Sequence, residues 1–259
     1  MGLVWWSIIV VGLAALVVGV LVWAMRRPGR PGEAAEGTLP ARLVLGLAVI
    51  GAALSAIGAI VSVLQTALAE EVAVTVPVQG FLPPVDAEVF DVVGPTADAL
   101  PSSPGFTEAA LTVAGLDGWT RAWLALGHAV NGAVIVVLLL LVAGLARRAL
   151  RTEPFVQPLG GRLALGGAAL AIGSFIWQAA YGVAGSLAST QVFAATSWAS
   201  TADVSMRYEG TGLQGTGQPT PAFAFEIEFW PIGVGFALIV LAGLLRTAER
   251  LQRDTAGLV

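Results

Sequence analysis

Four polar side chains that could do chemistry lie within long apolar stretches of this chain: Gln65, His128, Asn131 and Gln178. His128 and Asn131 are three residues apart in the sequence, which places them on one face of a helix. An ionisable residue inside a membrane marks a path for protons or ligands, whereas polar groups that hydrogen-bond across helices hold a bundle together. Because no carboxylate lies along the same stretches, we favour the structural role for this intramembrane polar cluster.

Other residue types that carry catalysis are scarce. The chain has no Cys, one His and three Met, which excludes disulfides, thiolate metal sites and bis-His haem ligation within the chain. Its acidic residues lack the spacing of a calcium-binding EF-hand, and no phosphate-binding glycine loop, catalytic triad or zinc helix motif is present. We therefore expect no enzyme, no metal and no cofactor other than a bound lipid. A haem or quinone held at a contact with another subunit stays open.

The composition is that of a membrane protein. Hydrophobic residues make up 56% of the 259-residue chain and charged residues 12%, and the mean hydropathy is +0.83. An apolar helix needs about 20 residues to cross a bilayer core of about 30 Å. Five stretches qualify: Leu3–Met25, Leu43–Ala69, Trp119–Leu145, Leu163–Ala188 and Phe229–Leu245. The sequence thus predicts an all-α polytopic membrane protein with five transmembrane helices.

The basic residues are all Arg, and all but two of the thirteen lie at the same end of these stretches. They form three groups: Arg26, Arg27, Arg30 and Arg42; Arg147, Arg148, Arg151 and Arg162; and Arg246, Arg250 and Arg253. Cytoplasmic segments that flank membrane helices collect Lys and Arg. We predict an N-terminus outside, a cytoplasmic C-terminus and an uncleaved first helix, since no basic segment precedes it. Arg without Lys, with abundant Ala and Gly, indicates a GC-rich bacterium and hence the bacterial plasma membrane.

Two segments on the predicted outer side, residues 70–118 and 189–228, contain alternating apolar and polar residues, which is typical of half-buried strands. We expect these two loops to form a small extracellular β-cap. Phe106–Leu116 has the pattern of a short amphipathic helix at the membrane interface. The four strand candidates are Val72–Val78, Ala87–Val93, Val204–Tyr208 and Phe223–Phe229.

An internal repeat appears when the helices are aligned. Arg42–Gly46 (Arg-Leu-Val-Leu-Gly) resembles Arg162–Gly166 (Arg-Leu-Ala-Leu-Gly), and Ala143–Arg147 resembles Ala242–Arg246. The pattern indicates a duplicated helix-loop-helix hairpin; chance similarity between Leu- and Gly-rich helices is the alternative. The predicted parts are an extra N-terminal helix (1–25), a cytoplasmic linker (26–41), a first hairpin (42–148), a cytoplasmic turn (149–161), and a second hairpin with a cytoplasmic tail (162–259).

Two cytoplasmic segments carry a family resemblance. Pro154-Phe155 and the paired glycines Gly160-Gly161 form a stiff turn, and the tail reads Leu251-Gln252-Arg253-Asp254 and ends in Val259. Over residues 41–259 the chain resembles a family of bacterial membrane proteins described as domain of unknown function 2975. The resemblance implies a four-pass protein with a Pro-Phe turn between its middle helices and a short tail. We expect the cytoplasmic turn and the tail to make contacts, and the candidate residues are Pro154, Phe155, Arg162, Leu251, Gln252 and Asp254. This chain departs from the family in its extra first helix and in Gln157-Pro158, and the family brings no established activity.

Three functions are compatible with these features. We favour a non-catalytic accessory or interaction subunit of a bacterial membrane complex, with the lipid bilayer, a membrane-protein partner or a second copy of the chain as its partners. One alternative is a small transporter or channel with a polar site near His128, Asn131 and Gln178. The other is a membrane sensor that acts with a cytoplasmic regulator. Nucleic-acid binding is not expected, because the Arg residues are spread over three loops close to the membrane.

Overall fold

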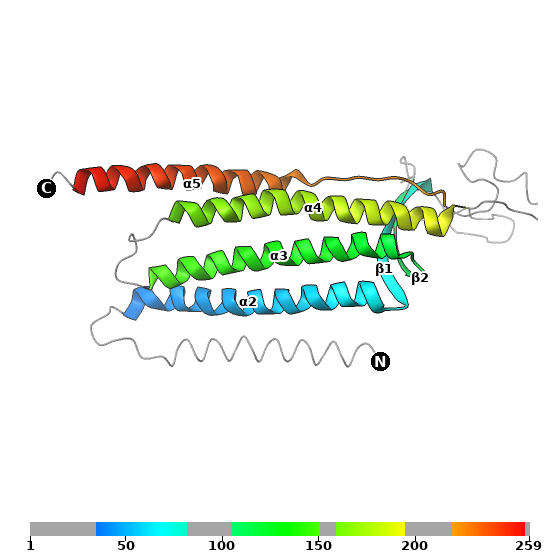
Figure 1. Cartoon of the computed structure of the whole chain (residues 1–259), viewed down its shortest axis with the longest axis horizontal. Helices are drawn as coiled ribbons and strands as arrows, with labels where there is room; N and C mark the ends of the chain where they lie inside the picture. Colours follow the sequence, from blue (N-terminus) through cyan, green and yellow to red (C-terminus); the bar gives the residue numbers. More distant parts are fainter. Residues whose placement is uncertain (1–34, 82–104, 151–158, 195–218, 257–259) are drawn as a thin grey trace, which may run out of the picture. The chain divides into compact units, whose positions relative to one another are not determined.

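The computed structural model describes residues 35–81, 105–150, 159–194 and 219–256 (Figure 1). These ranges hold helices α2 (Ala35–Leu68), α3 (Gly118–Ala149), α4 (Leu159–Phe193) and α5 (Phe229–Ala256), and strands β1 (Glu71–Phe81) and β2 (Phe106–Ala114). All four helices are long and apolar enough to cross a membrane. Four of the five predicted helices are therefore confirmed as apolar helices of spanning length, and the predicted Leu3–Met25 helix lies outside the described residues.

The described elements form two compact units. Unit 1 comprises Met1–Val61, His128–Trp177 and Glu228–Val259, and unit 2 comprises Ser62–Gly127 and Gln178–Ile227. Each helix except α5 contributes to both units. The two units are described separately below.

Unit 1 is a set of helices packed side by side through glycine. Gly132 of α3 lies against Ala59 of α2, and Gly173 of α4 lies against Val134 of α3. The closest approach joins α4 and α5, where a Cβ on Gly167 would lie 2.5 Å from the Gly235 carbonyl oxygen. Small residues of this kind let helix backbones approach closely in a membrane, where apolar surface alone gives little drive for association.

Unit 2 contains an antiparallel hairpin built from one loop. Strand β1 pairs with β2 from Glu71 opposite Ala114 to Pro77 opposite Glu108, with an irregularity before Phe81 opposite Phe106. The strand predicted from the alternating valines is confirmed as part of β1. Its buried face packs against α3 and α4 residues such as Leu124 and Ala184, and this face consists of Val72, Val74 and Val76. Gly115, at φ 75°, turns the chain from β2 toward α3.

The prediction of a helix over Phe106–Leu116 is wrong, because this segment forms β2. Ala109, Leu111 and Val113 pack against the buried β1 face, whereas Ala110, Thr112 and Ala114 are exposed. Buried and exposed residues thus alternate along β2 with a period of two. Because the segment is short, its apolar residues also fit the spacing of a helix, and only the pairing with β1 decides between the two patterns.

The prediction of a strand over Phe223–Phe229 is also wrong. Residues 219–228 are extended but form no ladder; one isolated bridge, Val78 opposite Pro221, joins them to β1. Among the described residues the second loop thus adds a single extended segment to the hairpin, and α4 continues to Phe193, five residues beyond the predicted end at Ala188. The strand candidates Ala87–Val93 and Val204–Tyr208 lie outside the described residues.

The predicted repeat has matched burial at its signature positions. Gly46 and Gly166 are both buried, and so are Ala143 and Ala242. Thr66 and Ser186, which align when α2 is superposed on α4 in sequence, both donate a hydroxyl hydrogen bond to the carbonyl four residues earlier, at 2.8 Å in each case. The duplication stays a prediction, and these equivalences are what a duplicated hairpin would produce.

Candidate functional site

Unit 2 holds its hairpin with a set of polar side chains. We call β1, β2 and the extended residues 219–227 the hairpin platform. Ser186 and Ser189 near the end of α4 bond to the platform itself. Arg121, Asp117 and Gln191 bond to the chain where α2 leads into β1 and where β2 leads into α3. These contacts decide what the platform can do, and they are described one by one.

Arg121 binds the carbonyl end of α2. Its guanidinium donates to the carbonyl oxygens of Ala69 at 2.6 Å, Glu70 at 3.1 Å and Thr66 at 3.4 Å, and also to that of Leu116 at 3.1 Å. The last carbonyls of a helix have no partner within the helix and carry its negative dipole end. A half-buried guanidinium with several fixed donors satisfies them together, so Arg121 fastens the start of α3 to the place where α2 leads into β1.

Asp117 caps the start of α3. Its carboxylate accepts a hydrogen bond from the Thr120 backbone N–H at 2.7 Å, which is the usual N-cap geometry. Gln191 of α4 completes the arrangement, since its amide accepts from the Asp117 N–H at 3.1 Å and donates to the Thr120 hydroxyl at 2.7 Å. Hydrogen bonds from Thr120 to its charged form lower the pKa of Asp117 below its usual value of 3.8.

Two serines of α4 hold the extended parts of the platform. The Ser189 hydroxyl donates to the Pro77 carbonyl of β1 and accepts from the Ala222 N–H at 3.4 Å. The Ser186 hydroxyl, one helical turn earlier, accepts from the Ala224 N–H at 3.4 Å. Gly185 directly precedes Ser186, and a Cβ there would be 2.6 Å from the Thr75 carbonyl oxygen. The extended chain therefore runs directly along the surface of α4.

A shallow groove runs beside this contact. It has a volume of about 260 Å³ and is lined by Val183, Ser186, Leu187, Thr190, Pro221, Ala222 and Phe223. Large aromatic side chains stand exposed on the same unit: Phe223 is 75% exposed, Trp119 65% and Phe106 62%. Trp119 packs edge-on against Trp123 with ring centroids 5.8 Å apart, which fixes the direction of the exposed ring.

The four residues of the predicted polar cluster fall in different units. His128 and Asn131 are half-buried on α3 in unit 1, whereas Gln178 on α4 and Gln65 on α2 belong to unit 2. Gln178 is half-buried and Gln65 is exposed, so Gln65 does not share the buried setting of the other three. His128 and Gln178 each have interaction partners, and the structural role favoured from the sequence stays a prediction. Within the described ranges, no group of three or more His, Cys, Asp or Glu side chains could hold a metal ion.

The residues predicted to make the cytoplasmic turn and tail contacts lie only partly within the described residues. Pro154 and Phe155 lie outside the described residues, and Leu251, Gln252 and Asp254 belong to the last turns of α5. Arg162 is an exposed residue of the first turns of α4. No sequence pattern marks Arg121, Ser186, Ser189 or Gln191. Only the N-cap of α3 could have been predicted, because Asp117 and Thr120 stand at N-cap spacing before an apolar run.

Comparison of the chain with protein-family models, with curated proteins and with solved structures gives no match. The resemblance to the domain of unknown function 2975 family stays a prediction from the turn and tail motifs. The functional proposal below therefore depends on the chemistry of the described residues.

Proposed function

We propose that this chain is a non-catalytic integral membrane protein that serves as an accessory or interaction subunit and presents the hairpin platform to a partner protein. The observation that carries the proposal is the fixing of an extended backbone by side chains of α4, while Arg121 of α3 holds the chain where α2 leads into that backbone. Arg121, Ser186 and Ser189 bond to main-chain groups of the platform or of the helix end that leads into it. A surface ordered before binding has less conformational entropy to lose when a partner docks.

The exposed aromatic residues support the choice of the platform as the binding surface. Phe106, Trp119 and Phe223 are large, apolar and exposed on a unit whose backbone is held in place. Aromatic side chains on an ordered frame are enriched among residues that dominate binding free energy. Aromatic residues also collect where a membrane meets water, and the test below separates these two explanations.

The test is the composition of the complex that a C-terminally tagged chain brings out of its native membrane in mild detergent, measured by native mass spectrometry. We expect a stoichiometric partner that Phe106→Ser and Phe223→Ser release. Phe236→Ser is the matched control, because Phe236 is an equally large side chain, 59% exposed, on α5 of unit 1. A partner lost with Phe236→Ser but retained by the platform variants would contradict docking at the platform. A lone monomer or homo-oligomer would contradict the accessory role and favour a self-contained carrier or sensor.

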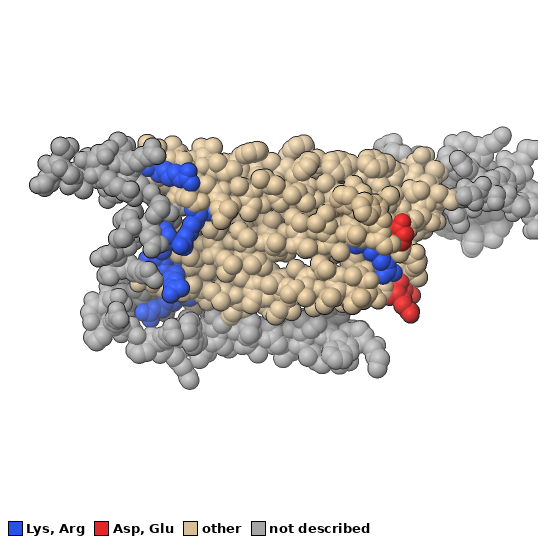
Figure 2. Space-filling view, in the orientation of Figure 1, with Lys and Arg blue, Asp and Glu red and all other residues tan. Residues whose placement is uncertain are grey.

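We also propose that the platform lies on the outer side of a bacterial plasma membrane and that the C-terminus is cytoplasmic. In unit 1, Arg42 and Arg162 lie near the starts of the apolar spans Pro40–Leu68 and Gly160–Phe193, and Arg147, Arg148 and Arg246 lie near the ends of the spans Gly118–Ala149 and Phe229–Ala248. Figure 2 shows Arg side chains gathered at one end of the described helices. This is the side on which the positive-inside rule expects the cytoplasm.

A membrane-impermeant thiol reagent tests the orientation, because the chain has no Cys of its own. Thr112 of β2 and Thr247 of α5 are both exposed and suit single replacements by Cys. We expect Thr112→Cys to react in intact cells and Thr247→Cys to react only after lysis. The reverse result would overturn the orientation. Gly160 in the predicted cytoplasmic turn is less suitable than Thr247 for replacement by Cys, because a Cβ at Gly160 would be 2.7 Å from the Ala242 carbonyl oxygen.

A further inference from the structure

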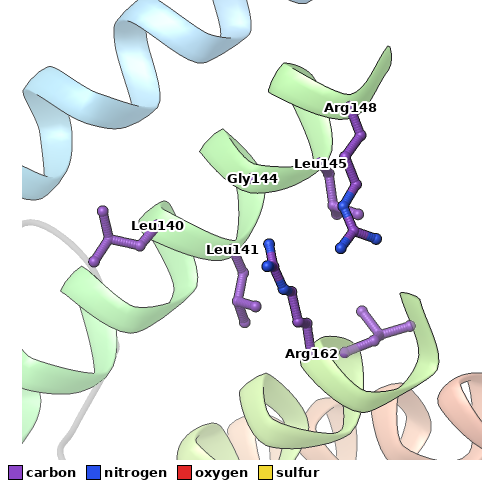
Figure 3. A pocket seen from close by; sticks show the side chains of 7 residues that line it. Leu140, Leu141, Gly144, Leu145, Arg148 and Arg162 are labelled. Atoms are coloured by element: carbon purple, nitrogen blue, oxygen red, sulfur yellow. The ribbon is translucent and has the colours of Figure 1, made fainter. Parts of the chain in front are cut away.

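A small cavity lies between α3 and α4 in unit 1 (Figure 3). Its volume is about 40 Å³, and the residues that line it are five apolar ones and two arginines. The apolar lining comes from Leu140, Leu141, Gly144 and Leu145 of α3 and Leu163 of α4, and the arginines are Arg148 and Arg162. The cavity thus combines an apolar wall with two cations.

The two guanidinium groups reach the cavity from different helices. Arg148 extends from the last turn of α3 and Arg162 from the first turns of α4, and both side chains point into the space between the helices (Figure 3). Gly144 lies beside one of them, because a Cβ at Gly144 would be at van der Waals distance, 3.6 Å, from Nη1 of Arg162. Arg246 of α5 is a third cation nearby, with Nη2 3.8 Å from the Cβ position of Gly161, next to Arg162.

Helix capping accounts for only part of this arrangement. A cation in the last turn of a helix is stabilised by the negative end of the dipole, which explains Arg147 and Arg148 on α3. Arg162 has the opposite placement, because it lies near the positive end of α4, where a cation is unfavourable. An anion beside Arg162 would offset this unfavourable placement.

We propose that this cavity binds the phosphate group of an anionic phospholipid, with Arg148 and Arg162 as its ligands. Guanidinium groups bind phosphate oxygens through paired, charge-assisted hydrogen bonds. A cavity of about 40 Å³ exceeds the roughly 10–15 Å³ that one water needs, so it admits phosphate oxygens, and the glycerol and acyl chains then run outside it along the leucines of α3. A lipid is favoured over free phosphate because the wall is apolar and both helices have the length and hydropathy of membrane spans. This inference does not depend on the accessory role proposed above.

The test measures the melting temperature of the full-length chain in neutral detergent as a lipid or salt is titrated in. We expect phosphatidylglycerol to raise the melting temperature and phosphatidylcholine to leave it unchanged. Arg148→Gln and Arg162→Gln should each require about tenfold more phosphatidylglycerol for the same rise, the loss expected for a charge-assisted hydrogen bond. Arg147→Gln is the matched control, since Arg147 lies in the same last turn of α3 but does not line the cavity. It should behave as wild type.

Three outcomes would overturn the proposal. An equal loss in Arg147→Gln would show a general attraction of lipid to a basic surface. An equal rise with inorganic phosphate alone would assign the site to the free ion. No difference between the two lipids with the wild-type chain would remove the site altogether, even if the glutamine variants fail to fold. Arg148→Lys gives a further check, because it keeps the charge but loses the paired geometry and should retain only part of the affinity.

Discussion

The two halves of α4 use small residues for different partners. In unit 1, Gly166, Gly167 and Gly173 bring other helices close to α4. In unit 2, Gly182 and Gly185 do the same for extended chain, and Ser186 and Ser189 accompany them. A neighbouring helix has its backbone groups paired already, whereas an extended segment outside a ladder does not. Among the described residues, the Ser186 and Ser189 hydroxyls of the unit 2 half bond to the main chain of the platform, whereas the Ser174 hydroxyl of the unit 1 half bonds to the Ala171 carbonyl of its own helix.

Replacing a contact glycine should have the largest effect in both halves. A methyl group in Gly167→Ala would meet backbone atoms of α5, with the Gly235 carbonyl oxygen at 2.5 Å and the Ile239 nitrogen at 3.0 Å, and Gly185→Ala would meet the Thr75 carbonyl oxygen at 2.6 Å. Because backbone must move, each change should lower the free energy of unfolding by about 2–3 kcal/mol. Thermal or denaturant unfolding in detergent measures the loss.

The matched control for this prediction is Gly243→Ala on α5. No described atom lies within 4 Å of a Cβ at Gly243, so its stability should stay within about 1 kcal/mol of wild type, on the more stable side. If Gly167→Ala unfolds no more easily than Gly243→Ala, the close approach of α4 and α5 is wrong.

Loss of Arg121 should come next. Arg121→Gln removes most of the donors that reach the Ala69, Glu70 and Leu116 carbonyl oxygens, and we expect a loss of about 2 kcal/mol because charged hydrogen bonds to a helix end are given up. Arg147→Gln removes the same charge from an exposed position and should change stability by less than about 0.5 kcal/mol. Equal melting temperatures for the two variants would show that Arg121 does not support the platform.

A smaller effect is expected at the hydroxyl contacts. Ser189→Ala leaves the Pro77 carbonyl and the Ala222 N–H without their partner, and it should cost about 1–2 kcal/mol. Thr247 provides the comparison, because its exposed hydroxyl bonds only to the Gly243 carbonyl of its own helix, and Thr247→Ala should have almost no effect. If Ser189→Ala and Thr247→Ala lower the free energy of unfolding equally, the Ser189 hydroxyl does not stabilise the platform, and the contrast between the two halves of α4 is wrong.

The smallest effect is a pH dependence carried by Asp117. Its pKa is lowered in the folded chain by hydrogen bonds from Thr120, so its contribution to stability is complete above the unfolded value of 3.8 and is lost as the pH falls through the folded pKa. Asp117→Asn keeps an oxygen acceptor for the cap but does not titrate. We expect the melting temperature of wild type to fall more steeply than that of Asp117→Asn below about pH 4. Parallel curves would contradict this origin of the acid sensitivity.

Apolar stretches predict the described membrane helices well, since length and hydropathy decide whether a segment crosses a bilayer. The alternating valines predict β1 for a similar reason, because one face of the strand is buried in unit 2. Strand β2 could not be assigned in this way. Its apolar residues satisfy a helical and an alternating pattern alike, and only the pairing with β1 selects the strand.

The platform contacts could not be predicted, for a different reason. Arg121, Ser186 and Ser189 bond to main-chain carbonyl and N–H groups, which every residue carries and which no residue type marks. Asp117 was accessible in principle, because N-cap residues bond to the N–H of a residue two or three positions later. The cavity at Arg148 and Arg162 also depends on geometry, since only the packing of α3 against α4 brings the two arginines together.

Arg121 is synthesised later than the helix end that it stabilises. The carbonyl groups at the end of α2 are completed by a side chain that lies 52 residues beyond Ala69. A ribosome releases α2 and the hairpin before it releases Arg121, so this end of α2 needs water as its hydrogen-bond partner throughout that interval. Once Arg121 has been synthesised, its guanidinium replaces this water. The hydrogen bonds at the end of α2 are therefore completed only when α3 forms.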